Sequence, residues 1–229
     1  MIDILHALDL GVSQDTVGNI LWEVLKSTLL PGDNMNEKCK GLWHRLLQHD
    51  RAYDTPSRLQ ALTVEMIRQQ GKGPKLRAKA AETKGMVPFA VEMAIEMHAL
   101  IDSPHSLTVV QCASSLMDFY MLMLLNEWHH EEASFACRKF CTLYAALSRE
   151  AATSGPGGRF WRVKPRFHMF SELAEYKAPV YGTPSEYWNY MDEDFVGWVA
   201  ALASSRGGPK SAATTAKNVI DRYRALLSL

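Results

Sequence analysis

Apolar residues recur every three to four positions along most of this chain, and Gly- and Pro-rich breaks separate the segments that show this spacing. The spacing is that of one face of an α-helix. The segments are residues 13–30, 35–47, 56–67, 76–101, 107–128, 131–150, 192–205 and 211–227. Hydrophobic residues make up 47% of the 229 positions, enough for a full core. The sequence therefore predicts a mainly α-helical protein.

Segment 107–128 is apolar on nearly all sides. A helix of that kind is buried in the centre of a protein. We therefore expect it to be the central core helix, with almost fully buried side chains at Leu116, Phe119, Leu122 and Met123. Pro88 predicts a kink or a restart within segment 76–101.

The strongest break is the run Ser-Gly-Pro-Gly-Gly at residues 154–158. It predicts a helical bundle domain over residues 1–153 and a smaller α+β or α segment over 159–229, packed on that domain. Alternating aromatic residues predict a strand within 159–170, and the apolar lead-in at 1–10 predicts a second short strand. The four cysteines form no C-x-x-C pair, and we see neither a targeting signal nor an apolar run long enough for a bilayer. These features predict a soluble, intracellular protein.

A basic cluster begins in the break after segment 56–67 and continues into segment 76–101: Lys72, Lys75, Arg77, Lys79 and Lys84. One interpretation is a solvated helix face. The other is contact with the phosphate backbone of DNA, which would be sensitive to salt. Because the chain has 25 basic and 25 acidic residues, its net charge attracts no nucleic acid, and only a local excess of charge does.

Two groups of carboxylates are candidate metal ligands. Asp3 precedes His6 by three residues at the start of the chain, and Asp192, Glu193 and Asp194 form an acidic triplet. Mg²⁺ prefers such oxygen ligands. The alternatives are structural: a lone pair of ligands makes no site, and acidic residues at the start of a helix stabilise its dipole.

Four segments together resemble DDE transposases of the CACTA-like and related kinds. The opening run at 2–12 has the form D-x-x-H-x-x-x-x-G and is similar to the segment with their second catalytic Asp. Residues 79–89 look like their helical insertion, and 164–170 are similar to their K-x-H strand. Residues 187–195 resemble the segment that bears the final Glu.

The resemblance implies the C-terminal half of a ribonuclease-H-like fold with a helical insertion. It assigns catalysis to Asp3 and Glu193, and Mg²⁺ binding to Asp3, Glu193 and Asp192. The reaction would be Mg²⁺-dependent DNA strand transfer or cleavage by two metal ions. The first catalytic Asp is expected upstream of Asp3, so the chain is expected to be a truncated or domesticated copy that is catalytically incomplete alone. The implied partner is DNA and the implied location is the nucleus.

The first functional hypothesis is therefore a transposase-derived, DNA-interacting protein. The alternative is a helical protein–protein interaction or scaffold domain without catalysis, which would bind a protein partner or a second copy of itself. A third hypothesis is a small-molecule enzyme with an unrecognised cleft. DNA binding at the basic cluster separates the first hypothesis from the second.

Overall fold

The computed structural model describes residues 3–153, 159–186, 217 and 220. The chain divides into two compact units, residues 1–188 and 189–229, and all elements named below belong to the first. They are the π-helix η1 (Leu5–Ser13), α1 (Gln14–Lys26), α2 (Met35–Ala52), α3 (Val64–Ile67), α4 (Ala80–Ile101), α5 (Pro104–Leu122), α6 (His130–Thr153), α7 (Pro165–Glu172), the π-helix η2 (Leu173–Lys177), α8 (Ala178–Tyr181) and the 3₁₀ turn η3 (Pro184–Glu186). The prediction of a mainly α-helical protein is confirmed.

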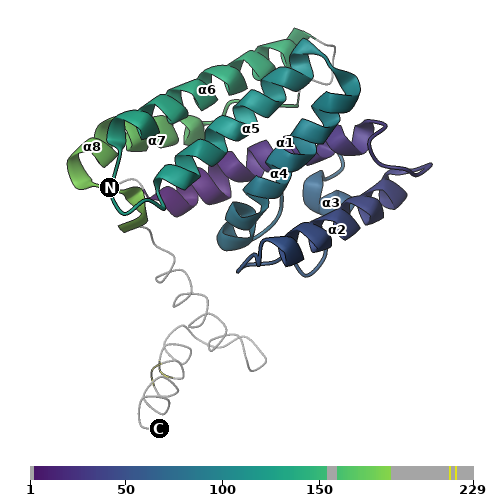
Figure 1. Cartoon of the computed structure of the whole chain (residues 1–229), viewed down its shortest axis with the longest axis horizontal. Coiled ribbons are helices and arrows are strands. Elements are labelled where there is room, and N and C mark those ends of the chain that lie inside the picture. Colours follow the sequence, from purple (N-terminus) through teal and green to yellow (C-terminus); the bar gives the residue numbers. More distant parts are fainter. Residues whose placement is uncertain (1–2, 154–158, 187–216, 218–219, 221–229) are drawn as a thin grey trace. The chain divides into compact units, whose positions relative to one another are not determined.

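The long helices α4, α5 and α6 lie side by side, with α5 between the other two (Figure 1). Helix α1 packs on α4, while α7 packs on η1 and α6. Helix α4 begins after Lys79, whose backbone N–H donates to the Glu82 carboxylate over 2.8 Å. Pro88 lies inside α4, which continues without interruption from Ala80 to Ile101. The restart expected at this proline does not occur.

The most enclosed helical segment is not the one that the sequence indicated. Between residues 4 and 25, every side chain is buried except those of His6, Leu10 and Glu23. Helix α5 instead ends at Leu122, and that side chain is only half-buried. The other core positions expected on this segment, Leu116, Phe119 and Met123, are buried. Apolar content alone failed to find the centre because α1 buries polar residues that hydrogen-bond to neighbouring segments.

The two expected strands are absent from the described residues. Residues 5–13 form η1, and residues 165–172 form α7, whose first residue is Pro165. A short apolar run fits a buried strand and a buried helix equally well. Helices α4 and α7 pack on η1, so its apolar residues are enclosed in a helical environment. The ribonuclease-H-like arrangement remains a prediction.

No helix within the described ranges is long and apolar enough to cross a membrane.

Candidate anion-binding pocket

A pocket of about 160 Å³ lies where two irregular segments meet α1. One is the loop at residues 68–78, between α3 and α4, and the other is the segment at 159–164, before α7. We call this cavity the basic pocket. Its lining residues are Asp15, Asn19, Gln69, Lys72, Gly73, Pro74, Lys75, Arg77, Tyr144, Arg159, Arg162 and Lys164.

Backbone hydrogen bonds fix the 68–78 loop against α1. The Leu76 N–H donates to the Gln14 carbonyl over 2.8 Å, and the Gln14 side-chain amide donates to the Ala78 carbonyl over 2.7 Å. The approach is close at Gly18, where an added Cβ would come within 2.5 Å of the Lys75 Cα. Only glycine permits this contact, so the sequence of α1 determines where the loop lies.

The 159–164 segment is held on the same helix by side-chain hydrogen bonds. The Trp161 N–H donates to Asn19 Oδ1 over 2.9 Å, and the Trp161 indole N–H donates to Glu23 Oε1 over 2.5 Å. The loop and the segment also touch each other directly. A Cβ added at Gly73 would lie 2.2 Å from the Arg159 carbonyl oxygen. The two walls of the pocket, the loop and the segment, are therefore in direct contact.

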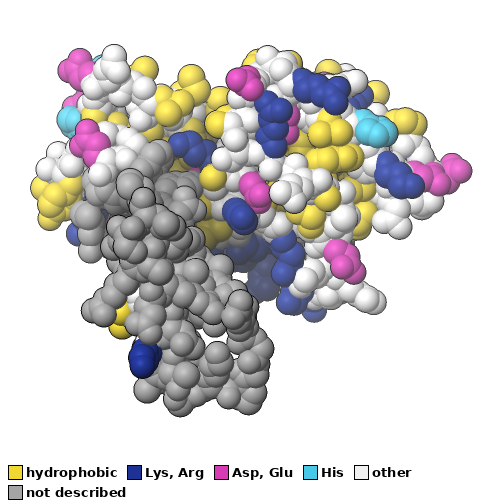
Figure 2. Space-filling view, turned by 90° about the horizontal axis from the view of Figure 1, so that it is seen from below, with side chains coloured by type: hydrophobic (Ala, Val, Ile, Leu, Met, Phe, Trp, Pro, Cys, Tyr) yellow, Lys and Arg dark blue, Asp and Glu magenta, His cyan; other side chains and the backbone are white. Residues whose placement is uncertain are grey.

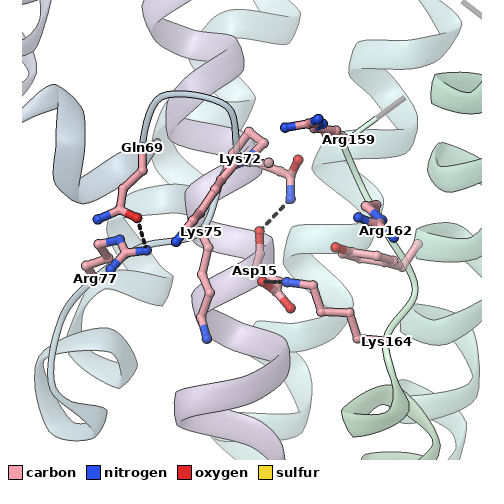
Figure 3. A pocket seen from close by; sticks show the side chains of 12 residues that line it. Asp15, Gln69, Lys72, Lys75, Arg77, Arg159, Arg162 and Lys164 are labelled. Atoms are coloured by element: carbon pink, nitrogen blue, oxygen red, sulfur yellow. Dashed lines mark hydrogen bonds and ion pairs between the residues drawn. The ribbon is translucent and has the colours of Figure 1, made fainter. Parts of the chain in front are cut away.

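Positive charge dominates the basic pocket. Six cationic side chains line it against the single carboxylate of Asp15, a formal excess of five charges when Asp15 is ionised. Figure 3 shows Lys72, Lys75 and Arg77 on one side of Asp15, and Arg159, Arg162 and Lys164 on the other. Figure 2 shows Lys and Arg side chains gathered close together on one face of the molecule.

Only part of this charge is neutralised within the pocket. Asp15 forms an ion pair with Lys164, and Arg77 donates to the neutral Gln69 amide over 2.6 Å. Burial raises the pKa of Asp15, and the cations Lys164, Lys75 and Arg166 oppose this rise. Burial also lowers the pKa of Lys75, as do the neighbouring cations. Burial therefore disfavours the charged forms of Asp15 and Lys75. A bound anion would stabilise the cationic side chains of the pocket.

Two further cations stack on aromatic rings contributed by α1 and by the 159–164 segment. The Arg68 guanidinium lies 4.7 Å from the Trp22 ring and 5.1 Å from the Phe160 ring, measured to the ring centroids. The Lys26 ammonium lies 5.2 Å from the Phe160 centroid. Trp22 is buried and Phe160 is half-buried. The two rings therefore hold Arg68 and Lys26 beside the loop and the segment that form the pocket.

The structure divides the basic cluster of the sequence into two parts. Lys72, Lys75 and Arg77 line the basic pocket. Lys79 precedes the first turn of α4, and Lys84 is half-buried further along that helix, where burial lowers its pKa and the Asp9 carboxylate opposes the change. Neither Lys79 nor Lys84 lines the pocket.

The sequence analysis missed Arg159, Arg162 and Lys164. These residues lie more than 80 positions after Lys72, and only the fold brings them to the same pocket. The feature that could have identified them is the alternation of basic and aromatic residues just after the Gly-rich break. The alternation was interpreted as a strand, so the basic side chains were not considered as a group.

Of the carboxylates expected to bind Mg²⁺, only Asp3 lies in the part of the chain that the structure describes. The Asp3 carboxylate accepts the backbone N–H of Leu5 over 3.1 Å and that of His6 over 3.3 Å, and it also pairs with the His6 ring. Asp192, Glu193 and Asp194 lie outside the described residues. Among the residues that are described, no group of three His, Cys, Asp or Glu side chains is placed to hold a metal ion.

The chain matches no family model, no curated protein and no solved structure.

Proposed function

We propose that this protein binds DNA by contacts between the basic pocket and the phosphates of the strand. One observation carries the proposal. Two segments about 80 residues apart in sequence contribute six cations to a pocket that contains one carboxylate. Because the whole chain has no formal net charge, this excess is a local feature of the fold and no consequence of composition.

The exposed members of the pocket have the chemistry for this role. Lys72, Arg77, Arg159 and Arg162 are all exposed. Arg presents a planar fork of donors that matches phosphate oxygens, and Lys supplies a compact charge. Phosphate contacts of this kind provide affinity and orientation with little dependence on base sequence. The expected activity is therefore sequence-tolerant binding.

DNA is the partner that the resemblance to transposases implies, but the proposal is limited to binding. Strand transfer by two metal ions needs carboxylate oxygens that are directed at the ions. Asp3 is the only described residue among the expected catalytic carboxylates, and its oxygens are engaged at the start of its own helix. The proposed contact is made by cationic side chains alone.

The test is fluorescence anisotropy with labelled single-stranded DNA at a series of salt concentrations. Three or four phosphate contacts give a log–log slope of the binding constant against salt of about −3.

A variant with Lys72, Arg77, Arg159 and Arg162 changed to Ala should bind at least about 100-fold more weakly at low salt, with a slope near zero. The control changes four other exposed cations, Lys40, Arg51, Lys79 and Lys139, to Ala. It loses the same charge and should bind within a factor of about two of the wild type. Equal losses in both variants would contradict a localised site.

A second candidate is the protein-interaction function, and one observation favours it. A groove between α5 and α6 has Leu122, Phe135 and Ala136 beside Asp118, Glu131 and Glu132, and the Phe135 side chain is 62% exposed. Exposed aromatic residues in such grooves are typical of interfaces. If the groove mediates self-association, sedimentation velocity should show a concentration-dependent dimer that Phe135→Asp abolishes. Absence of DNA binding at low salt together with such a dimer would favour this function.

A further inference from the structure

One of the residues that line the basic pocket, Tyr144, has a buried hydroxyl group that the proposed function does not use. The Tyr144 side chain is 0% exposed. Its ring packs against Phe167 at 4.2 Å, Trp161 at 5.2 Å and Phe140 at 5.8 Å between centroids. The hydroxyl has no hydrogen-bond partner within the described chain. Leaving a buried hydroxyl unsatisfied is destabilising, so a fold that keeps one beside a pocket of cations suggests a missing acceptor.

The size of the pocket admits a phosphate group as this acceptor. Its volume is about 160 Å³, which is enough for a phosphate group together with ordered waters. A phosphodiester within a strand has a nucleoside on both sides, and both must find room at the mouth of the recess. A phosphate at the end of a strand is attached on one side only.

The charge of the pocket favours the same group. A phosphate monoester has a charge of about −1.5 to −2 at pH 7 and three free acceptor oxygens. A diester has a single charge and two free oxygens. The base of the pocket already has Lys75 and Lys164 near Asp15, and Arg159 and Arg162 lie on the adjacent wall. Several cations that face a small recess are matched better by the dianion.

We propose that the basic pocket captures the terminal phosphate of a DNA strand, and that the Tyr144 hydroxyl donates a hydrogen bond to one of its oxygens. The inference rests on the proposed DNA binding and adds a ligand to it. The exposed pocket cations Lys72 and Arg77 are left to contact the following nucleotides. The protein is then a binder of phosphorylated strand ends, with a lower affinity for internal segments of DNA.

The experiment compares oligonucleotides that share one sequence and differ only at their ends: 5′-phosphate, 3′-phosphate or hydroxyl. A hydroxyl-ended strand two nucleotides longer matches the added charge of the phosphate. We expect one phosphorylated end to bind about tenfold more tightly than the hydroxyl-ended strands of either length. Equal affinity for all strands would overturn the inference and leave DNA binding intact. No binding to any strand would overturn the proposed function itself.

The matched variant is Tyr144→Phe, which removes only the unpartnered hydroxyl and keeps the buried ring. We expect it to melt at or slightly above the wild-type temperature. It should reduce the preference for the phosphorylated end about five- to tenfold, with unchanged affinity for hydroxyl-ended strands. A preference that persists in full would exclude Tyr144 from the site.

Competition separates a strand end from a free anion of the same chemistry. Inorganic phosphate offers the same oxygens without the attached nucleotides. We expect it to displace the phosphorylated strand only at a concentration at least about 100-fold above the strand's Kd. Displacement at a concentration similar to that Kd would identify the free anion as the ligand and overturn the assignment to DNA.

Discussion

Helix α1 presents two acidic residues to its surroundings, Asp15 and Glu23, and their environments are opposite. Around Asp15 cations are in excess: Lys164 pairs with it, and Lys75 and Arg166 lie close enough to act on its pKa. Around Glu23 carboxylates are in excess. Each oxygen of Glu23 has a partner, Trp161 for one and His105 for the other.

The network around Glu23 is closed. The His105 ring lies 3.0 Å from Glu23 through Nε2 and 2.9 Å from Glu150 through Nδ1. The hydrogen bond and charge of Glu23, together with Glu150, raise the pKa of His105 to about 9 despite burial. A closed network of this kind stabilises a fold, whereas the unmatched cations around Asp15 leave capacity for a ligand. The comparison indicates that the balance of partners, more than the number of charges, determines whether a cluster of charged side chains can accept a further ion.

The largest expected effect comes from a change that alters no charge. Gly73→Ala places a Cβ against the Arg159 carbonyl and must separate the two walls of the basic pocket. Overpacking of this kind costs about 1–3 kcal/mol of stability, and we expect DNA affinity to fall at least about tenfold. Gly41→Ala is the control, because its Cβ would meet only Leu30 at 3.9 Å. Chemical denaturation and anisotropy measure the two effects. Unchanged affinity for Gly73→Ala would show that the walls bind independently.

The second prediction concerns the closed network. Glu23→Gln removes the main anion facing His105. Because the His105 side chain is 35% exposed, solvent screens the interaction, and we expect a loss of about 1 kcal/mol at pH 6–7. The folded-state pKa of about 9 exceeds the ordinary value of 6.5. The stabilisation is therefore complete below pH 6.5 and is lost as the pH rises through 9. Urea melts of both proteins should converge by about pH 10. The Gln side chain of this variant keeps an Oε1 that can accept the Trp161 indole N–H, so DNA affinity at pH 7 should stay close to that of the wild type. A large loss of affinity would show that the charge of Glu23 is needed to hold the 159–164 segment in place.

The smallest effect is expected at Asp15. Asp15→Asn keeps the shape of the side chain and removes the only carboxylate that lines the basic pocket. DNA affinity should rise about three- to fivefold at low salt, since the local excess of positive charge increases. Stability should change little because burial already disfavours the charged carboxylate. Isothermal titration calorimetry would detect the gain, and a weaker complex would indicate that Asp15 positions Lys164 for the ligand.

Apolar spacing is a local property, so the sequence predicted the long helices α1, α2, α4, α5 and α6. Of the segment expected as a helix over 56–67, only Val64–Ile67 is helical, and residues 192–205 and 211–227 lie outside the described residues except for 217 and 220.

The basic pocket depends on contacts that are not local. The buried polar residues Gln14, Asp15 and Asn19 interrupt the apolar face of α1, and each has a partner at residues 78, 164 or 161. The spacing of apolar residues does not predict which polar residues are buried. The sequence indicates the basic residues on one side of the pocket, Lys72, Lys75 and Arg77. Those on the other side lie in a stretch that the sequence predicts to contain a strand.

The hydrogen bond from Trp161 to Asn19 joins residues 142 positions apart. On a ribosome, the 68–78 loop emerges about 85 residues before the 159–164 segment, roughly 4–17 s earlier at ordinary rates of synthesis. During that interval the nascent chain has only one side of the pocket, and Asp15 and Asn19 of α1 lack their partners Lys164 and Trp161. The pocket is therefore completed late in folding. Binding of a strand end would then require that the unit of residues 1–188 has already folded.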